Sequence, residues 1–217
     1  MEDHEKEELE RIYKAIRIER EMALNIAMAK LENAAKMSRY KEDRYNIFGT
    51  ITSRIKTFDS TVEKCQRRGY QLSSDSICKN VLDIAGIRIV TPFRDDIYSV
   101  VEILHHIPGL FIGDEKDYVS SPKENGYSSY HLQTQLEISN AINGGTKLVP
   151  VEIQVRDKAM DLWATTEHIV KYKNLTASPK AAEHYRNIAE LLRRVDELAV
   201  ELRDFGRIDA SADEKKE

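Results

Sequence analysis

Two acidic side chains are the residues of this sequence best suited to holding a metal ion. Asp83 opens the apolar run 84–90, and Glu152 occupies a polar position within a second run, 147–156. Mg²⁺ is usually bound by one or two carboxylates and fills its remaining positions with water and phosphate oxygens. Each acid alone has a plainer interpretation, because Asp83 could cap a helix and Glu152 could be a surface residue. As a pair they are candidate Mg²⁺ ligands.

Cations and a hydroxyl gather where a predicted strand passes into a helix. Arg54 and Lys56 lie at the end of a strand predicted within 45–56, and Ser60 and Lys64 lie in the first turns of the next helix. The first N–H groups of a helix have no partner within the helix, so such a place suits a polyphosphate. A solvated charged face is the alternative interpretation.

The polar faces of two predicted strands form a third candidate surface. Runs 128–138 and 147–156 flank Asn143-Gly144-Gly145, which is typical of a hairpin turn, so the two strands should pair antiparallel. One face of each strand is apolar. The other face carries side chains able to bind metal, phosphate or a base, namely His131, Gln133, Gln135, Glu152, Gln154 and Arg156. A half-buried sheet can also simply present such a face to water.

An aromatic residue stands where this polar face begins. The loop 121–126 leads into Tyr127, whose ring could stack on a purine or could be an ordinary cross-strand aromatic. The sequence contains no GxxxxGK[ST] phosphate loop and no kinase-type HRD or DFG motif. If the protein transfers phosphate, it uses another arrangement.

Composition limits the class of protein. The 217 residues, 41% hydrophobic and 32% charged, can bury one ordinary core, and the net charge of −4 argues against a stable nucleic-acid partner. Cys65 and Cys78 lack the spacing of a zinc site. No apolar run approaches the roughly 18 residues of a membrane span. We expect one cytoplasmic domain over 1–217 with no membrane partner.

Hydrophobic periodicity predicts the elements that position these residues. A long helix is expected within 1–40, a strand within 45–56, a helix from Thr57 or Asp59 to Gly69, a strand over 84–90 and a helix after Pro92. The hairpin follows, then one helix before 173 and an amphipathic helix over 179–206. The tail 207–217 is charged and small, so we expect it to be disordered. This order predicts an α+β fold with a central mixed β-sheet flanked by helices.

Five motifs, in order, resemble the synthetase domain of the RelA/SpoT family. They are Arg54-Ile55-Lys56 with Ser60 and Lys64, then 83–88 (DIAGIR), 126–131 (GYSSYH), 151–156 (VEIQVR) and 163–168 (WATTEH). The resemblance runs from about 45 to 173, which we take as the catalytic core. The length and the helical ends look like the stand-alone small alarmone synthetases, with their nucleotidyltransferase-like synthetase fold.

The resemblance implies an enzyme that moves the pyrophosphate of ATP onto the ribose 3′-hydroxyl of GDP or GTP, with GMP as a further candidate acceptor. It implies that ATP is bound by Arg54, Lys56, Ser60, Lys64 and Arg88, with the two arginines on either side of adenine. It implies that the acceptor is bound by Lys123, Tyr127, His131, Gln154 and Arg156, with Tyr127 on the guanine. Asp83 and Glu152 would hold Mg²⁺, and Glu152 would act as general base.

Further expectations follow from the same resemblance. The sequence contains no His-Asp pair, so the hydrolase activity of the long family members is not expected. The apolar stripes of the two terminal helices favour a homo-oligomer, a tetramer as in relatives. Three alternative functions remain: a toxin that pyrophosphorylates the 3′ end of tRNA, a catalytically silent nucleotide-binding protein, and a nucleotidyltransferase. A nucleotidyltransferase would need closely spaced acids on one strand, and this sequence lacks them.

Overall fold

Five strands form one mixed sheet at the centre of the molecule. The computed structural model describes residues 3–42, 45–139, 144–172 and 179–213. The strands lie in the order β1 (Thr50–Ile55), β2 (Ala85–Thr91), β5 (Thr146–Asp157), β4 (Tyr130–Ser139) and β3 (Leu110–Asp117). β2 and β5 are parallel and the other neighbours are antiparallel. The predicted α+β class with a mixed sheet is confirmed.

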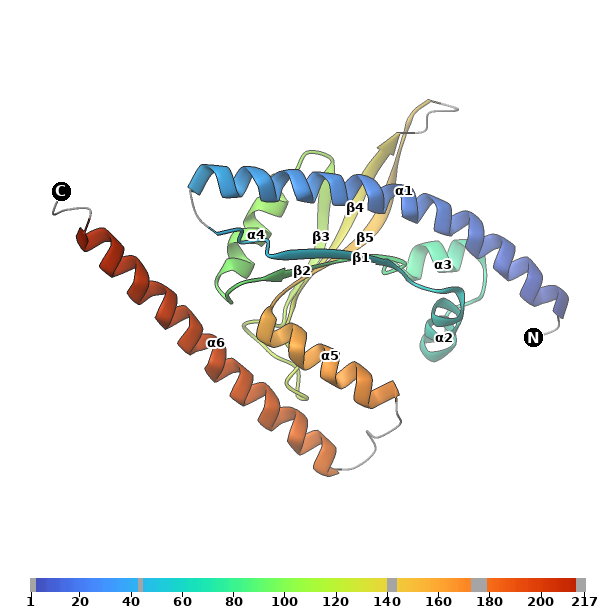
Figure 1. Cartoon of the computed structure of the whole chain (residues 1–217). Coiled ribbons are helices and arrows are strands. Elements are labelled where there is room, and N and C mark those ends of the chain that lie inside the picture. Colours follow the sequence, from blue (N-terminus) through green and yellow to red (C-terminus); the bar gives the residue numbers. More distant parts are fainter. Residues whose placement is uncertain (1–2, 43–44, 140–143, 173–178, 214–217) are drawn as a thin grey trace.

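Helices cover the two faces of this sheet differently (Figure 1). α1 (Asp3–Glu42) runs across one face, in contact with β1, β2, β4 and β5, and α4 (Asp96–His105) packs beside it on β3 and β5. α5 (Lys158–Tyr172) and α6 (Pro179–Asp213) lie on the opposite side. α2 (Phe58–Arg68) and α3 (Ser74–Asn80) pack beneath the first half of α1. The face toward α5 is therefore the one left open for a site.

The main core lies between α1, α4 and the apolar face of the sheet. Leu31 of α1, Leu104 of α4 and Ile153 of β5 are all buried in one cluster. Burying a side chain of this size stabilises a fold by about 1.5–3 kcal/mol. Since strand residues alternate between faces, burying Val151, Ile153 and Val155 turns the residues between them toward α5.

Local sequence signals that were predicted from the chain are present in the structure. Thr57 is the N-cap of α2 and accepts a hydrogen bond from the Ser60 amide at 3.2 Å. Gly69 ends that helix with φ +69°, a left-handed conformation that favours glycine. β4 and β5 pair antiparallel along ten residue pairs, as the hairpin pattern predicts. The turn residues 140–143 lie outside the described residues.

Two elements were not predicted, and several boundaries differ. β3 is an edge strand whose second half, Gly113–Asp117, has no apolar alternation, and α3 is a polar helix of seven residues. The strand expected within 45–56 is confined to Thr50–Ile55. α6 continues to Asp213, so residues 207–213 extend the helix, and 214–217 lie outside the described residues. Within the part of the chain that the structure describes, no helix combines the length and apolarity needed to cross a membrane.

Candidate active site

A cleft of about 650 Å³ opens on the polar face of the sheet, bounded by β1, β2, β5 and α5. Side chains of β1, β2 and β5 form the floor of the cleft, and residues that are partners in the strand register lie side by side in rows across it. Arg54 of β1 is paired with Gly86 of β2, which is paired in turn with Glu152 of β5. Because Gly86 has no side chain, the floor stays open between Arg54 and Glu152. Seven of the predicted site residues line the cleft, namely Arg54, Asp83, Arg88, Tyr127, Glu152, Gln154 and Arg156.

Asp83 is held between two lysines at one end of the cleft. Its carboxylate lies 2.8 Å from Lys64 Nζ and 3.1 Å from Lys56 Nζ, and all three side chains are largely shielded from solvent. Burial alone would raise the pKa of Asp83, but the hydrogen bond from Lys64 and the charges of both lysines bring it below its usual value. Asp83 is therefore an anion that concentrates two cations beside the cleft.

Glu152 is oriented by two amide side chains. Gln133 Nε2 donates to Glu152 Oε1 at 3.1 Å, and Gln154 Nε2 donates to Glu152 Oε2 at 2.8 Å. Arg156 in turn donates from Nη2 to Gln154 Oε1 at 2.6 Å. This chain of hydrogen bonds fixes the carboxylate on the sheet and leaves it facing the cleft. Burial lowers the pKa of Arg156, although an arginine keeps its charge in proteins.

Tyr127 and His131 form an aromatic pair next to these residues. The Tyr127 hydroxyl is 2.8 Å from His131 Nε2, and burial raises the pKa of the tyrosine. Burial and the neighbouring charges of Lys123 and Arg156 lower the pKa of His131 to about 4. At neutral pH His131 is thus uncharged, so it contributes hydrogen bonds rather than positive charge.

Five predicted residues lie outside the cleft lining, namely Lys56, Ser60, Lys64, Lys123 and His131. Ser60 is exposed on the first turn of α2, where its hydroxyl accepts a hydrogen bond from Thr57 Oγ1 at 2.9 Å. Lys123 lies behind the aromatic pair, with Nζ 4.5 Å from the Tyr118 ring centre and 4.8 Å from that of Tyr127. The structure brings Lys56 and Lys64 to Asp83, and His131 to Tyr127, but it places Ser60 beside the site rather than in it.

Three further residues belong to this region although they had no predicted role in catalysis. Asp161 of α5 lies 3.4 Å from both Arg88 Nη1 and Arg156 Nη1, and so links the two arginines. Asn125 Nδ2 donates to Glu167 Oε1 at 2.7 Å, and Asn125 Oδ1 accepts from the Tyr127 amide at 3.2 Å. The sequence pointed to Asn125 only as part of the loop 121–126 and to Glu167 only as part of the motif 163–168. Their pairing across 42 residues has no local sequence signal.

The donor set suits a hard divalent cation. Asp83 and Glu152 contribute carboxylate oxygens to the same cleft, and Mg²⁺ needs only one or two such ligands when phosphates supply others. Within the described ranges no cluster of three or more acidic, histidine or cysteine side chains gathers as a metal cage. A site made by two acids and a bound nucleotide is consistent with both observations.

Comparison with known proteins decides the family. The model described as "Region found in RelA / SpoT proteins" matches residues 53–177, more than half of the chain. The chain belongs to the RelA/SpoT family. The GTP pyrophosphokinase YwaC of Bacillus subtilis is 38% identical over 146 residues, covering 67% of this chain and 69% of that protein. YjbM of the same organism, also a GTP pyrophosphokinase, is 35% identical over 175 residues, 80% of either chain.

Solved structures of RelA/SpoT relatives share the fold. Small alarmone synthetase 1 from Bacillus subtilis, bound to its product pppGpp, superposes with a TM-score of 0.81 at 32% identity, over 90% of this chain and 98% of that one. The same protein bound to AMPCPP gives a TM-score of 0.75 at 30% identity, over 90% and 97%. The cleft described above therefore lies in a fold shared with small alarmone synthetases.

Proposed function

We infer that this protein is a GTP pyrophosphokinase, which transfers the pyrophosphate of ATP to the 3′-hydroxyl of GDP or GTP and produces (p)ppGpp. One observation carries the inference from geometry. Asp83, from the turn before β2, and Glu152 of the adjacent strand β5 line one cleft together with Arg54, Arg88 and Arg156. A polyphosphate donor needs this combination of metal-binding acids and cations, and the family membership supplies the reaction.

The β1–β2 side of the cleft is proposed to bind ATP. Arg54 and Arg88 lie two residues apart in the register of adjacent strands and therefore on the same face, so their guanidinium groups can take the two faces of adenine. Lys56 and Lys64 form ion pairs with Asp83, and the same two ammonium groups would also attract the triphosphate of ATP. Ser60, at the N-terminal turn of α2, is proposed to reach the outer phosphates.

The side of the cleft nearest α5 is proposed to bind the guanine nucleotide. Tyr127 offers a ring for stacking on the base, held in place by its contacts with His131 and the Trp163 ring, whose centre is 5.9 Å away. Lys123 and Arg156 supply positive charge for the acceptor's phosphates, while His131 and Gln154 supply hydrogen bonds. GDP, GTP and GMP would share every contact to the base and the ribose.

Alignment and charge neutralisation would then accomplish the transfer. Asp83 and Glu152 would hold Mg²⁺, which when bound withdraws charge from the phosphate oxygens. Glu152, oriented by Gln133 and Gln154, accepts the proton of the 3′-hydroxyl. The 3′ oxygen forms a bond to the β-phosphorus, the bond from that phosphorus to the α,β-bridging oxygen breaks, and AMP leaves. No covalent enzyme intermediate is required.

The protein is also proposed to act as a homotetramer in the cytoplasm, where its substrates are found. α6 exposes apolar side chains at alternating spacings of three and four residues, a pattern typical of helix–helix association. They are Ile188, Leu191, Val195, Leu198, Leu202 and Phe205. The sequence has no His-Asp pair, so product hydrolysis is not part of the proposal.

The proposal is tested by incubating the purified protein with Mg²⁺ and ATP labelled on the γ-phosphate, together with GDP, GTP, GMP or deacylated tRNA. Labelled product on GDP or GTP, with AMP formed in equal amount, is the expected result. Label on tRNA alone would assign the chain to the tRNA-modifying relatives. Release of labelled pyrophosphate or phosphate without any acceptor product would overturn the proposal.

A further inference from the structure

Helix α6 packs directly behind the loop that carries Tyr127. Trp163 Nε1 of α5 donates to the Tyr185 carbonyl of α6 at 2.9 Å, and the two rings lie 5.8 Å apart. Gly126, the residue before Tyr127, is so close to α6 that a Cβ built on it would lie 2.5 Å from the Ala189 Cβ. The position of the tyrosine therefore depends on how α6 sits against the loop and α5.

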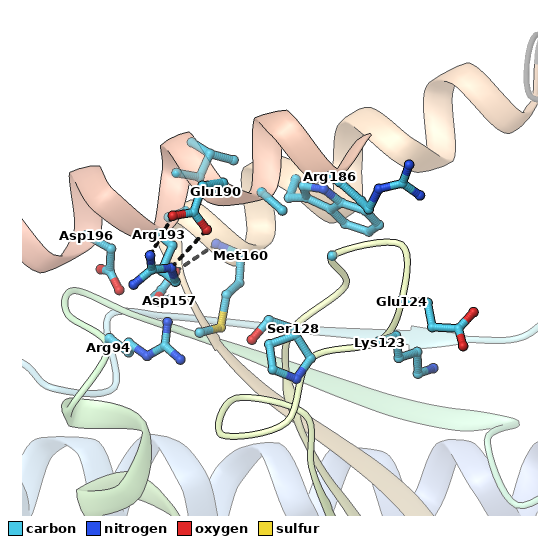
Figure 2. A pocket seen from close by; sticks show the side chains of 16 residues that line it. Arg94, Lys123, Glu124, Ser128, Asp157, Met160, Arg186, Glu190, Arg193 and Asp196 are labelled. Carbon is cyan, nitrogen blue, oxygen red and sulfur yellow. Dashed lines mark hydrogen bonds and ion pairs between the residues drawn. The ribbon is translucent and has the colours of Figure 1, made fainter. Parts of the chain in front are cut away.

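A second pocket, of about 240 Å³, lies between this loop, α5 and α6 (Figure 2). Two acids, Asp157 and Asp196, lie near each other at one end of it, with Lys123 and Glu124 at the other. Asp157 is 1% exposed and Asp196 is 6% exposed. Asp157 Oδ1 caps α5 by accepting from the Met160 amide at 2.7 Å. The Oδ2 atoms of Asp157 and Asp196 are both buried and receive no hydrogen bond from another described protein donor.

A proton shared between the two carboxyl groups resolves this otherwise costly arrangement. A buried carboxylate oxygen without a donor destabilises a fold by more than an exposed one does. If Asp196 is protonated, its carboxyl group can donate a hydrogen bond to the Asp157 carboxylate. Burial, followed by the charge and the hydrogen bond of Asp157, raises the pKa of Asp196 to about 7. This is the behaviour of two acids that share one site.

Other charged groups around the pair do not replace this proton. Arg94 lines the pocket, but its Nη2 donates to the Val119 carbonyl at 2.6 Å. Arg193 of α6 is paired with Glu190 of the same helix, and Asp95 is paired with Arg203. The remaining charged groups that line the pocket are Lys123, Glu124 and Arg186.

We propose that Asp196 is a positioning residue for the acceptor nucleotide: by sharing a proton with Asp157 it fastens α6 behind Gly126 and Trp163 and so holds Tyr127 in place. This inference rests on the proposed function, because it assigns Tyr127 to the guanine. Asp196 itself does not line the catalytic cleft. Its effect is on the affinity for GDP or GTP, with the ATP side of the cleft untouched.

The proposal fixes the direction of a pH effect. When α6 is released, Asp196 returns toward its ordinary pKa of 3.8, whereas in the docked helix the value is about 7. Docking therefore takes up a proton between these pH values, and the docking constant falls as pH rises through that range. From pH 6 to pH 8 the fall is about tenfold, and above pH 8 it levels off.

The test uses Asp196→Asn, whose amide donates to Asp157 at every pH, and Glu201→Gln, which removes an exposed acid of the same helix that does not line the pocket. Amide hydrogen exchange of peptides covering residues 123–128 is measured at pH 6 and pH 8 without nucleotide, each variant being compared with the wild type at the same pH. From pH 6 to pH 8 the protection of these amides in the wild type should fall about tenfold relative to their protection in Asp196→Asn. Glu201→Gln should follow the wild type.

Kinetics complete the test. Between pH 6 and pH 8 the KM of the wild type for GDP should rise by up to about tenfold more than the KM of Asp196→Asn for GDP. The KM for ATP should change with pH in the same way in both proteins. Equal exchange behaviour of wild type and Asp196→Asn would overturn the proposal. An equal change in both KM values would also overturn it, because a general loss of structure would act on both substrates. If no transfer is detected at all, the proposed function fails, and the exchange experiment still decides whether Asp196 fastens α6.

Discussion

Replacing Gly126 with alanine offers a sharp test of the contact between α6 and the Tyr127 loop. The added Cβ would lie 2.5 Å from the Ala189 Cβ, whereas carbon atoms in contact are normally about 3.5–4.0 Å apart. The loop or the helix would have to move by about 1 Å or more. Overpacking of this kind costs about 1–3 kcal/mol. Gly126 also has φ +88°, which adds about 1–2 kcal/mol of backbone strain for alanine.

Two further variants separate these contributions. Gly144→Ala places alanine at φ +68° with no atom within 4 Å of the new Cβ, so it measures backbone strain without a steric contact. Gly126→Ala combined with Ala189→Gly removes the steric contact and keeps the strain. Because glycine within a helix costs about 0.5–1 kcal/mol relative to alanine, Ala189→Gly alone serves as the reference. In that background we expect Gly126→Ala to cost about 1–3 kcal/mol less stability than it does in the wild type.

Urea unfolding and the KM for GDP are the measurements for this series. Gly126→Ala should lower the midpoint of unfolding and raise the KM for GDP, and adding Ala189→Gly should partly reverse both changes. Gly144→Ala should leave the KM for GDP unchanged. The reasoning would be refuted if Gly126→Ala bound GDP like the wild type, or if it cost as much stability in the Ala189→Gly background as in the wild type.

Two other predictions concern stability and assembly. Asp83→Asn should reduce the free energy of unfolding by about 1.5–3 kcal/mol at pH 7, because it removes a charged partner of Lys56 and Lys64. Since those lysines lower the folded-state pKa of Asp83, the difference from wild type should shrink as pH falls through that lowered value; a constant difference down to pH 2 would contradict this. Replacing exposed Leu191 and Val195 of α6 with glutamate should lower the mass found by light scattering, and an unchanged mass would exclude this stripe from the oligomer interface.

Periodic and local features of the fold were predictable from the sequence. The β4–β5 hairpin follows from alternating apolar residues around Gly144 and Gly145, and the same alternation indicates which side chains face the cleft. Thr57 and Gly69 mark the ends of α2 because a capping hydroxyl and a left-handed glycine act within a few residues. Edge strand β3 was missed, since its polar half is mostly exposed and therefore shows no apolar alternation.

The candidate site was predictable only where its residues share a motif. Asp83 lies in the turn before β2 and Glu152 lies in β5, and the structure brings both to one cleft through the parallel pairing of β2 with β5. Other long-range contacts near the site belong to no shared motif. Asn125 with Glu167, and Asp157 with Asp196, are about forty residues apart, and no period or local rule relates them. Such pairs depend on helix packing, which a single sequence does not specify.

The role of Glu152 is the central claim, and one comparison tests it most directly. Wild type, Glu152→Gln and Glu137→Gln are assayed with ATP, GDP and Mg²⁺, and the formation of AMP and of the 3′-pyrophosphorylated product is followed together. Glu137 is an exposed acid of β4 that lies outside the cleft lining, so it provides the matched control.

We expect the wild type and Glu137→Gln to form both products at equal rates, and Glu152→Gln to be slower by about 100-fold or more because the 3′-hydroxyl loses its general base. Turnover by Glu152→Gln at the wild-type rate would contradict the account.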